Sequence, residues 1–189
     1  MDTKTKWNNK HQQHIKNLNQ PRPNERLKNL SSYFTGEQAL DIACGLGANS
    51  FYLAELGYQV DSLDISDVAI QFIKTKVDEQ RLSVTPRLCD LTELSRTIES
   101  DKIYDLVVVT YYLDRAIFPF IKTIINENGY VFMETFYKSS YHKKEGVSDK
   151  FKLNSNELLS EFADWHILFY EEHELEGRQT ILARKKPVG

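Results

Sequence analysis

The chain has 189 residues, a length that suits one domain with a buried hydrophobic core. Hydrophobic residues make up 41% of it and charged residues 27%, which is typical of a folded globular protein and not of a disordered or fibrous one. A formal net charge of −3 argues against the broad basic surface by which many proteins bind nucleic acid.

We expect neither a membrane partner nor a metal centre. No apolar run reaches the roughly 20 residues that a membrane-spanning helix needs. Residues 1–20 are polar where a signal peptide would be apolar, so the sequence predicts a cytoplasmic protein. Cys44 and Cys89 each lie in an apolar run, which predicts reduced thiols and no disulfide. No His/Cys cluster has zinc-ligand spacing, so no metal is predicted.

The N-terminal segment, residues 1–37, is predicted to be distinct from the domain at residues 38–189. It is rich in Asn, Gln and Lys, and Pro21 and Pro23 mark a turn within it. After this turn apolar residues recur at helical spacing, which predicts an arm followed by a short amphipathic helix. The residues that carry this spacing are Leu27, Leu30, Tyr33 and Phe34.

From residue 38 onward, short apolar runs alternate with helical patterns, which predicts a doubly wound α/β fold with a mostly parallel sheet. Ser66 is expected to cap a helix, Gly57 to end one, and Pro119 to fit only a first turn or a kink. The predicted strands are Ala39–Ala43, Gln59–Leu63, Val84–Cys89, Leu106–Thr110 and Tyr130–Thr135. The predicted helices are Asn49–Leu56, Asp67–Val77 and Arg115–Ile125.

The pattern changes after Thr135. A polar loop at Phe136–Lys152 and a short helix around Asn156–Phe162 precede two further strands, Trp165–Glu171 and Gln179–Arg184. A short turn joins these two strands, whereas a parallel pair needs a crossover of about a dozen residues. The sheet is therefore predicted to end in an antiparallel hairpin.

The segment Asp41–Asn49 carries the strongest functional signal. Gly45 and Gly47 lie between a strand and a helix, where they let the backbone turn tightly and approach a ligand. Asp64 ends the second strand at the place where a carboxylate can accept both ribose hydroxyls of an adenosine. Asp90 ends the third strand, beside the expected adenine pocket. A glycine turn alone is weak evidence for a nucleotide-binding loop. The acidic residues at three successive strand ends, Asp41, Asp64 and Asp90, make that interpretation stronger.

Two kinds of ligand suit such a loop, and charge separates them. A dinucleotide places its pyrophosphate at the glycine turn, where Asp41 would repel it. S-adenosylmethionine carries an ammonium and a sulfonium, which a carboxylate attracts. Position 50, where a dinucleotide fingerprint has its third glycine, is Ser. The loop therefore favours S-adenosylmethionine.

These residues resemble class I methyltransferases, nearest to the tellurite-resistance (TehB-like) branch. The resemblance begins at Asp41–Ala54 and extends over nearly the whole chain. Its segments include Gly57–Val60, Leu63–Ser66, Tyr104–Val109, Tyr112–Arg115, Gly129–Phe136, Asn156–Leu159 and Ala183–Lys185. It implies a seven-stranded sheet with the last strand antiparallel, and an N-terminal segment, residues 1–37, that closes as a lid.

The resemblance also implies roles for individual residues. The loop would face the methionine part of the cofactor, Asp64 the ribose, and Asp90 and Leu91 the adenine; Ile65 is also expected to bind the cofactor. Thr110 and Tyr111 would face the methionine amine or sulfonium. Many members have Gly where this chain has Ala43. The cofactor-binding residues expected in the loop are Asp41, Ala43, Cys44, Gly45, Gly47 and Asn49.

The acceptor side is less defined. Candidate substrate residues are Tyr112, Arg115, Glu134, Phe136 and His142, for which ordinary packing or solvation is an equally good explanation. None is an obvious catalytic base, and the catalytic residues and oligomeric state stay unassigned. Methyl transfer can rest largely on alignment, so a base is optional. Without an inserted substrate domain, a small acceptor is favoured: a thiol, a chalcogen oxyanion or a similar soft or anionic molecule.

Two other functions are compatible with these residues. The chain could be a non-catalytic sensor or partner subunit that retains cofactor binding. It could also be a dinucleotide oxidoreductase, although the charge of Asp41 argues against that. A methyltransferase that acts on a small molecule is the leading prediction.

Overall fold

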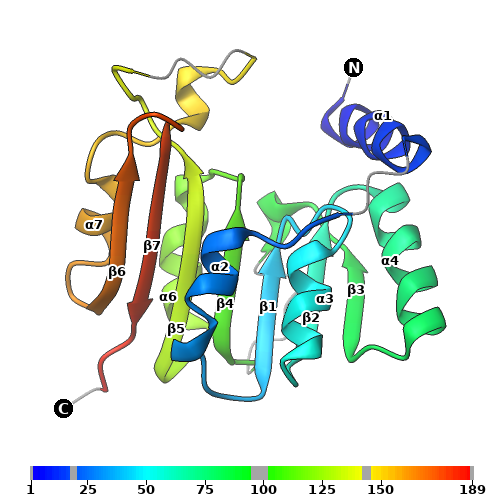
Figure 1. The fold of residues 1–189 in the computed structure, drawn as a ribbon, viewed down its shortest axis with the longest axis horizontal. Coiled ribbons are helices and arrows are strands. Elements are labelled where there is room, and N and C mark those ends of the chain that lie inside the picture. Colours follow the sequence, from blue (N-terminus) through cyan, green and yellow to red (C-terminus); the bar gives the residue numbers. More distant parts are fainter. Residues whose placement is uncertain (1, 18–20, 95–101, 142–145, 188–189) are drawn as a thin grey trace. The chain divides into compact units, whose positions relative to one another are not determined.

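The computed structural model describes residues 2–17, 21–94, 102–141 and 146–187. The chain divides into two compact units, Met1–Lys102 and Ile103–Gly189. Seven strands have the order β3-β2-β1-β4-β5-β7-β6 in one mixed sheet, which confirms the predicted fold class (Figure 1). Among the described residues, no helix combines the length and apolar character needed to cross a membrane.

The described residues of the first unit form three parallel strands and four helices. Strand β1 pairs with β2, and β2 pairs with β3, so the carboxyl ends of all three lie at the same edge. The helices are α1 (Thr3–Lys16), α2 (Glu25–Asn29), α3 (Ala48–Glu55) and α4 (Asp67–Gln80). The strands are β1 (Gln38–Ile42), β2 (Gln59–Asp64) and β3 (Val84–Leu88), with 3-10 turns at Ser31–Tyr33 and Leu91–Glu93. The three predicted strands are confirmed to within a residue at each end.

Local sequence explains these elements. Leu40 and Ile42 of β1 are fully buried, as expected of a strand covered on both faces. The Ser66 hydroxyl accepts the amide of Ala69 at 3.2 Å, which confirms the predicted cap of α4. Helix α4 runs to Gln80, beyond the predicted end at Val77. The prediction stopped early because the last turn of the helix is polar and continues no apolar repeat.

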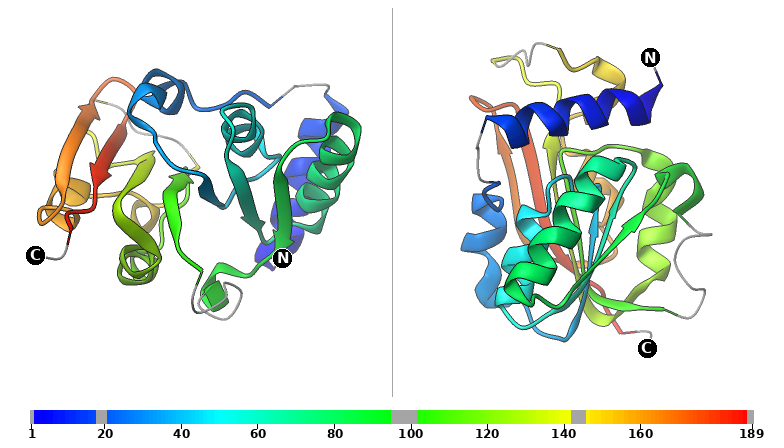
Figure 2. Two further views of the ribbon diagram at one scale, coloured as in Figure 1. Left: turned by 90° about the horizontal axis from the view of Figure 1, so that it is seen from below. Right: turned by 90° about the vertical axis from the view of Figure 1, so that its right-hand side faces the viewer.

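The predicted N-terminal arm is a helix for most of its length. Helix α1 begins after Asp2, whose carboxylate accepts the amide of Thr5 at 2.9 Å. Figures 1 and 2 show α1 crossing the first unit near the carboxyl ends of its strands. Sequence periodicity missed it because most residues of the helix are polar, and His11 is its one buried residue.

The second unit ends in the predicted hairpin. Strands β4 and β5 are parallel, whereas β7 is antiparallel to both β5 and β6. Its strands are β4 (Tyr104–Thr110), β5 (Ile125–Phe136), β6 (His166–His173) and β7 (Arg178–Arg184). Its helices are α6 (Phe118–Thr123) and α7 (Glu157–Glu161), with 3-10 turns at Arg115–Ile117 and Asp149–Phe151.

The helix predicted over Arg115–Ile125 is wrong at both ends. A 3-10 turn occupies its start, where the Asp114 carboxylate accepts the amide of Ala116 at 2.9 Å. Pro119 lies in the first turn of α6, as predicted. Strand β5 already begins at Ile125, five positions before the predicted Tyr130 and continuous with the apolar run that had suggested a helix.

Candidate functional site

The loop between β1 and α3 has an unusual backbone. Ala43, Gly45 and Gly47 have φ angles of 58°, 55° and 81°, in the left-handed region that favours glycine. A Cβ atom on Gly47 would lie 2.8 Å from Cγ1 of Ile73 on α4, so only glycine lets the loop pack this closely. The Cys44 amide donates to the Leu63 carbonyl at 3.0 Å and ties the loop to the end of β2.

Asp41, the last polar residue of β1, is fully buried below this loop. One of its oxygens, Oδ2, accepts the Ser50 hydroxyl at 2.6 Å. The other, Oδ1, is buried and has no hydrogen-bond partner among the described residues. Burial raises the pKa of Asp41 to about 7, an effect that the Ser50 hydrogen bond opposes. The carboxyl group therefore keeps an acceptor atom for a group that is not part of the described chain.

Asp64, the last residue of β2, holds the loop in place. Its Oδ2 accepts the Gly45 amide at 2.9 Å, and its Oδ1 accepts the Ser66 amide at 2.8 Å. It is 7% exposed, and Ile65 after it is half-buried. Each carboxylate oxygen can accept more than one hydrogen bond, so both retain capacity for a ligand.

Asn49 and Asp90 already have defined contacts. The buried Asn49 accepts the Asn24 amide at 2.8 Å through Oδ1, which joins α3 to the segment entering α2. Asp90 caps the 3-10 turn after β3 by accepting the Thr92 amide at 3.0 Å, and Leu91 beside it is buried. Their roles toward a cofactor stay predictions.

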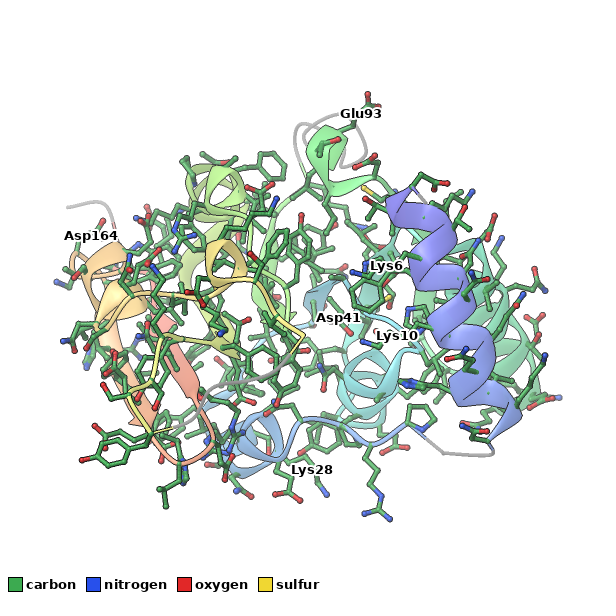
Figure 3. The ribbon with its side chains drawn as sticks, turned by 90° about the horizontal axis from the view of Figure 1, so that it is seen from above. Lys6, Lys10, Lys28, Asp41, Glu93 and Asp164 are labelled. Atoms are coloured by element: carbon green, nitrogen blue, oxygen red, sulfur yellow. The ribbon has the colours of Figure 1, made fainter. Side chains whose placement is uncertain are left out.

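Helix α1 adds a residue that sequence analysis did not select. His11 is 7% exposed, and a Cβ atom on Gly45 would lie 3.4 Å from its Cε1 atom. Figure 3 shows Lys6 and Lys10 on the side of α1 that faces Asp41. The helix is fixed to the start of α4 by polar contacts, since Asn8 donates to Asp67 at 2.6 Å and Lys4 pairs with Asp67 at 2.8 Å.

In the second unit a polar cluster forms around Glu134 on β5. Its buried carboxylate accepts the Tyr111 hydroxyl at 2.8 Å, Arg178 Nη1 at 3.0 Å and the Thr180 hydroxyl at 2.8 Å. Tyr111 also has a φ of 55° and packs against Phe136, with ring centroids 5.3 Å apart. Partial burial, together with the neighbouring Glu134, raises the pKa of Tyr111 to about 12. Arg178 was missed from sequence because a single Arg at the start of a strand carries no motif.

Arg115, a predicted substrate residue, is engaged in contacts within the second unit. Its guanidinium pairs with Glu157 at 2.5 Å and donates to the carbonyl oxygens of Lys150 and Lys152. It thereby joins the segment before α6 to the loop before α7. Thr110 ends β4 and is half-buried, as is Tyr112 just after it. His142 lies outside the described residues. These substrate assignments also stay predictions.

The first unit can be tested for its fit to S-adenosylmethionine. The Asp64 carboxylate and an Asp41 oxygen with no partner among the described residues both lie at the glycine loop, and ionised carboxylates attract cationic groups and hydroxyl donors. The same carboxylates would repel a pyrophosphate. The residues present therefore fit the ammonium, sulfonium and ribose of that cofactor. Among the described residues, no group of three or more His, Cys, Asp or Glu side chains could hold a metal ion.

The sheet order and this loop define a class of protein. They are those of the class I methyltransferase fold, and a geranyl diphosphate C-methyltransferase from Streptomyces coelicolor superposes with a TM-score of 0.66. That likeness covers 87% of this chain and 80% of the other, and at 13% identity it shows the fold alone.

A particular family is also shown. The sequence profile of the family described as "Tellurite resistance protein TehB" matches residues 33–181, and the chain belongs to this family. It is 30% identical over 166 residues to the "Probable S-adenosyl-L-methionine-dependent methyltransferase TehB" of Haemophilus influenzae, covering 79% of this chain. The chain spans 57% of that relative's length. The crystal structure of TehB from Haemophilus influenzae has a TM-score of 0.78 and 26% identity, over 92% of this chain and 66% of that one.

Proposed function

We propose that this chain is an S-adenosylmethionine-dependent methyltransferase that acts on a small acceptor. The observation that carries the proposal is the buried Asp41 carboxyl group, one oxygen of which has no partner in the described part of the chain, at a tightly packed glycine loop. Asp41 and the loop would hold the methionine part, and Asp64 would accept the ribose hydroxyls. The names of the relatives in the TehB family support the same activity.

When bound, the cofactor supplies a methyl group from its sulfonium. The acceptor's lone pair would form the new bond to the methyl carbon, and the electron pair of the broken carbon–sulfur bond would stay on sulfur. Such an in-line displacement needs alignment above all. The chain's part is therefore to fix the loop, through the Asp64 bonds to the amides of Gly45 and Ser66, and to hold the acceptor.

The second unit supports an acceptor that is ionised before it reacts. Tyr111 donates its hydroxyl hydrogen to Glu134, and its raised pKa of about 12 keeps it protonated near neutral pH. Glu134 already accepts three side-chain hydrogen bonds, so we propose that it positions Tyr111 and Arg178 for the acceptor. A thiolate or a chalcogen oxyanion suits such a site because it brings its own negative charge.

We further propose that the N-terminal segment, residues 1–37, acts as a lid on the domain at residues 38–189. Helix α1 supports this, since its contacts to Ser66 and Asp67 are polar and individually weak. The free thiols of Cys44 and Cys89 support a reducing compartment such as the cytoplasm.

Calorimetry and product analysis test this function. We expect the purified chain to bind S-adenosylmethionine and S-adenosylhomocysteine but not NAD. Mass spectrometry should then detect a methylated product in a panel of small thiols, selenite, tellurite, arsenite, phenols and amines. Binding of NAD in place of the adenosyl compounds would overturn the proposal. Cofactor binding without turnover on any acceptor, together with a stable partner recovered from cells, would instead favour the sensor or partner-subunit alternative.

A further inference from the structure

His11 is the one buried residue of helix α1. Its ring stacks on that of Trp7, with centroids 5.7 Å apart, and lies against the Gly45 turn of the cofactor loop. Lys10 covers the Trp7 ring, with Nζ 4.4 Å from its centroid. The helix therefore places an imidazole at the glycine turn, within reach of the charge of Asp64.

Both ring nitrogens of His11 are buried, and neither has a hydrogen-bond partner among the described residues. A buried polar group without a hydrogen bond destabilises the folded protein. Burial lowers the pKa of His11, although Asp64 opposes this, so the ring is neutral near pH 7 and carries one donor and one acceptor. The ring thus carries two hydrogen-bonding atoms beside the loop that have no partner among the described residues.

Packing alone does not account for a histidine at this position. An apolar side chain of similar size would fill the space beside Trp7 and Gly45 without the unsatisfied nitrogens. The polar contacts of α1 to the start of α4, made by Lys4 and Asn8, do not involve the ring. A ligand at the loop is therefore the natural partner for the imidazole.

We propose that His11 is a cofactor-binding residue, whose imidazole forms a hydrogen bond to the adenosyl ligand held at the Asp41–Gly47 loop. This role rests on the proposed function. It makes α1 part of the binding site, and it couples docking of the helix to binding of the ligand.

The test compares binding and helix docking in the full chain. S-adenosylhomocysteine is titrated by calorimetry into the wild-type protein, His11→Leu and His11→Gln, with His14→Leu as the matched control on the exposed side of the same helix. We expect His11→Leu to weaken binding about tenfold, the effect of one lost hydrogen bond. His11→Gln should stay within about threefold of wild type because its amide keeps a donor and an acceptor. His14→Leu should bind like wild type.

Hydrogen exchange of residues 3–16 in the ligand-free protein separates binding from docking. Since leucine removes the unsatisfied nitrogens, His11→Leu should exchange no faster than wild type. Equal affinities for wild type and His11→Leu would overturn the proposal, and so would faster exchange in His11→Leu, which would indicate a structural role. A wild-type chain that does not bind the ligand at all would instead overturn the proposed function on which the role rests.

Discussion

Ser50 donates a 2.6 Å hydrogen bond to Asp41 inside the first unit. This bond is part of a short chain of buried hydrogen bonds. The Ser62 hydroxyl on β2 donates in turn to Ser50 at 2.7 Å. Strand β1, strand β2 and helix α3 are thus linked through three polar side chains with 0% exposure. This chain of hydrogen bonds holds Oδ2 of the carboxyl group, and Oδ1 has no hydrogen-bond partner among the described residues.

Asp41 should make the protein's stability depend on pH. Its pKa is raised from 3.8 to about 7 in the folded protein, so between these values the native state binds more protons than the unfolded state. The free energy of unfolding should therefore fall as pH rises through this window and level off above about 7, with a slope of up to about 1.4 kcal/mol per pH unit from this group. Urea unfolding at several pH values measures it.

Asp41→Asn is the control for this pH dependence, because the amide does not titrate. The stability of the variant relative to wild type should rise with pH across the same window. If the difference between the two proteins is constant from pH 4 to pH 8, Asp41 does not titrate in that window.

Asp64→Ala should weaken S-adenosylmethionine binding by about 1.5–3 kcal/mol, the range for a hydrogen bond to a charged group. Asp61→Asn is the matched control, since Asp61 is also buried on β2 but pairs with Lys102 at 2.6 Å and Arg87 at 3.6 Å. That variant should lose stability without losing affinity. Calorimetry and thermal unfolding on both proteins measure the two effects. Unchanged affinity in Asp64→Ala would remove this carboxylate from the site.

Gly47→Ala should be more damaging than Gly57→Ala. Both glycines have positive φ angles, 81° and 98°, so both variants carry the backbone cost of roughly 1–2 kcal/mol. Only at Gly47 would the new methyl group also meet Ile73, at 2.8 Å, whereas at Gly57 it would meet nothing within 4 Å. We expect a further loss of about 1–3 kcal/mol in Gly47→Ala, from overpacking. Equal unfolding free energies for the two variants would contradict the close packing of the loop.

Most of the strands could be predicted because buried parallel strands are short apolar runs with clear ends. Tyr104–Thr110, in which Leu106, Val107, Val108 and Val109 are all buried, is the clearest example. Helix boundaries were harder to predict. Ile124 and Ile125 continue the apolar spacing of α6, but Ile124 is the residue that ends the helix and Ile125 is the first residue of β5. Apolar periodicity alone does not separate a helix from a strand that follows it directly.

The residues at the loop were accessible from sequence only where a motif marks them. Asp41 and the glycines belong to such a pattern, whereas His11 and Arg178 do not. His11 lies in a polar helix, where a buried face leaves no apolar stripe to detect. Arg178 comes to Glu134 through the pairing of β5 with β7, a contact between positions far apart in the chain. Such groupings follow from tertiary structure and not from local pattern.

The last prediction concerns the source of the acceptor's negative charge. The pKa of Tyr111 is about 12, so this residue stays protonated near neutral pH. Glu134 already accepts the Tyr111 hydroxyl, and we expect neither residue to remove a proton from the acceptor during turnover. For two acceptors of one chemical class whose own pKa values differ by about 1–2 units, the rising limb of kcat/KM against pH should therefore move with the acceptor. Tyr111→Phe should lower kcat/KM by about fivefold, through a lost hydrogen bond, and leave that limb in place. A limb that is the same for both acceptors, and that disappears in Tyr111→Phe or Glu134→Gln, would show that a protein base controls the reaction.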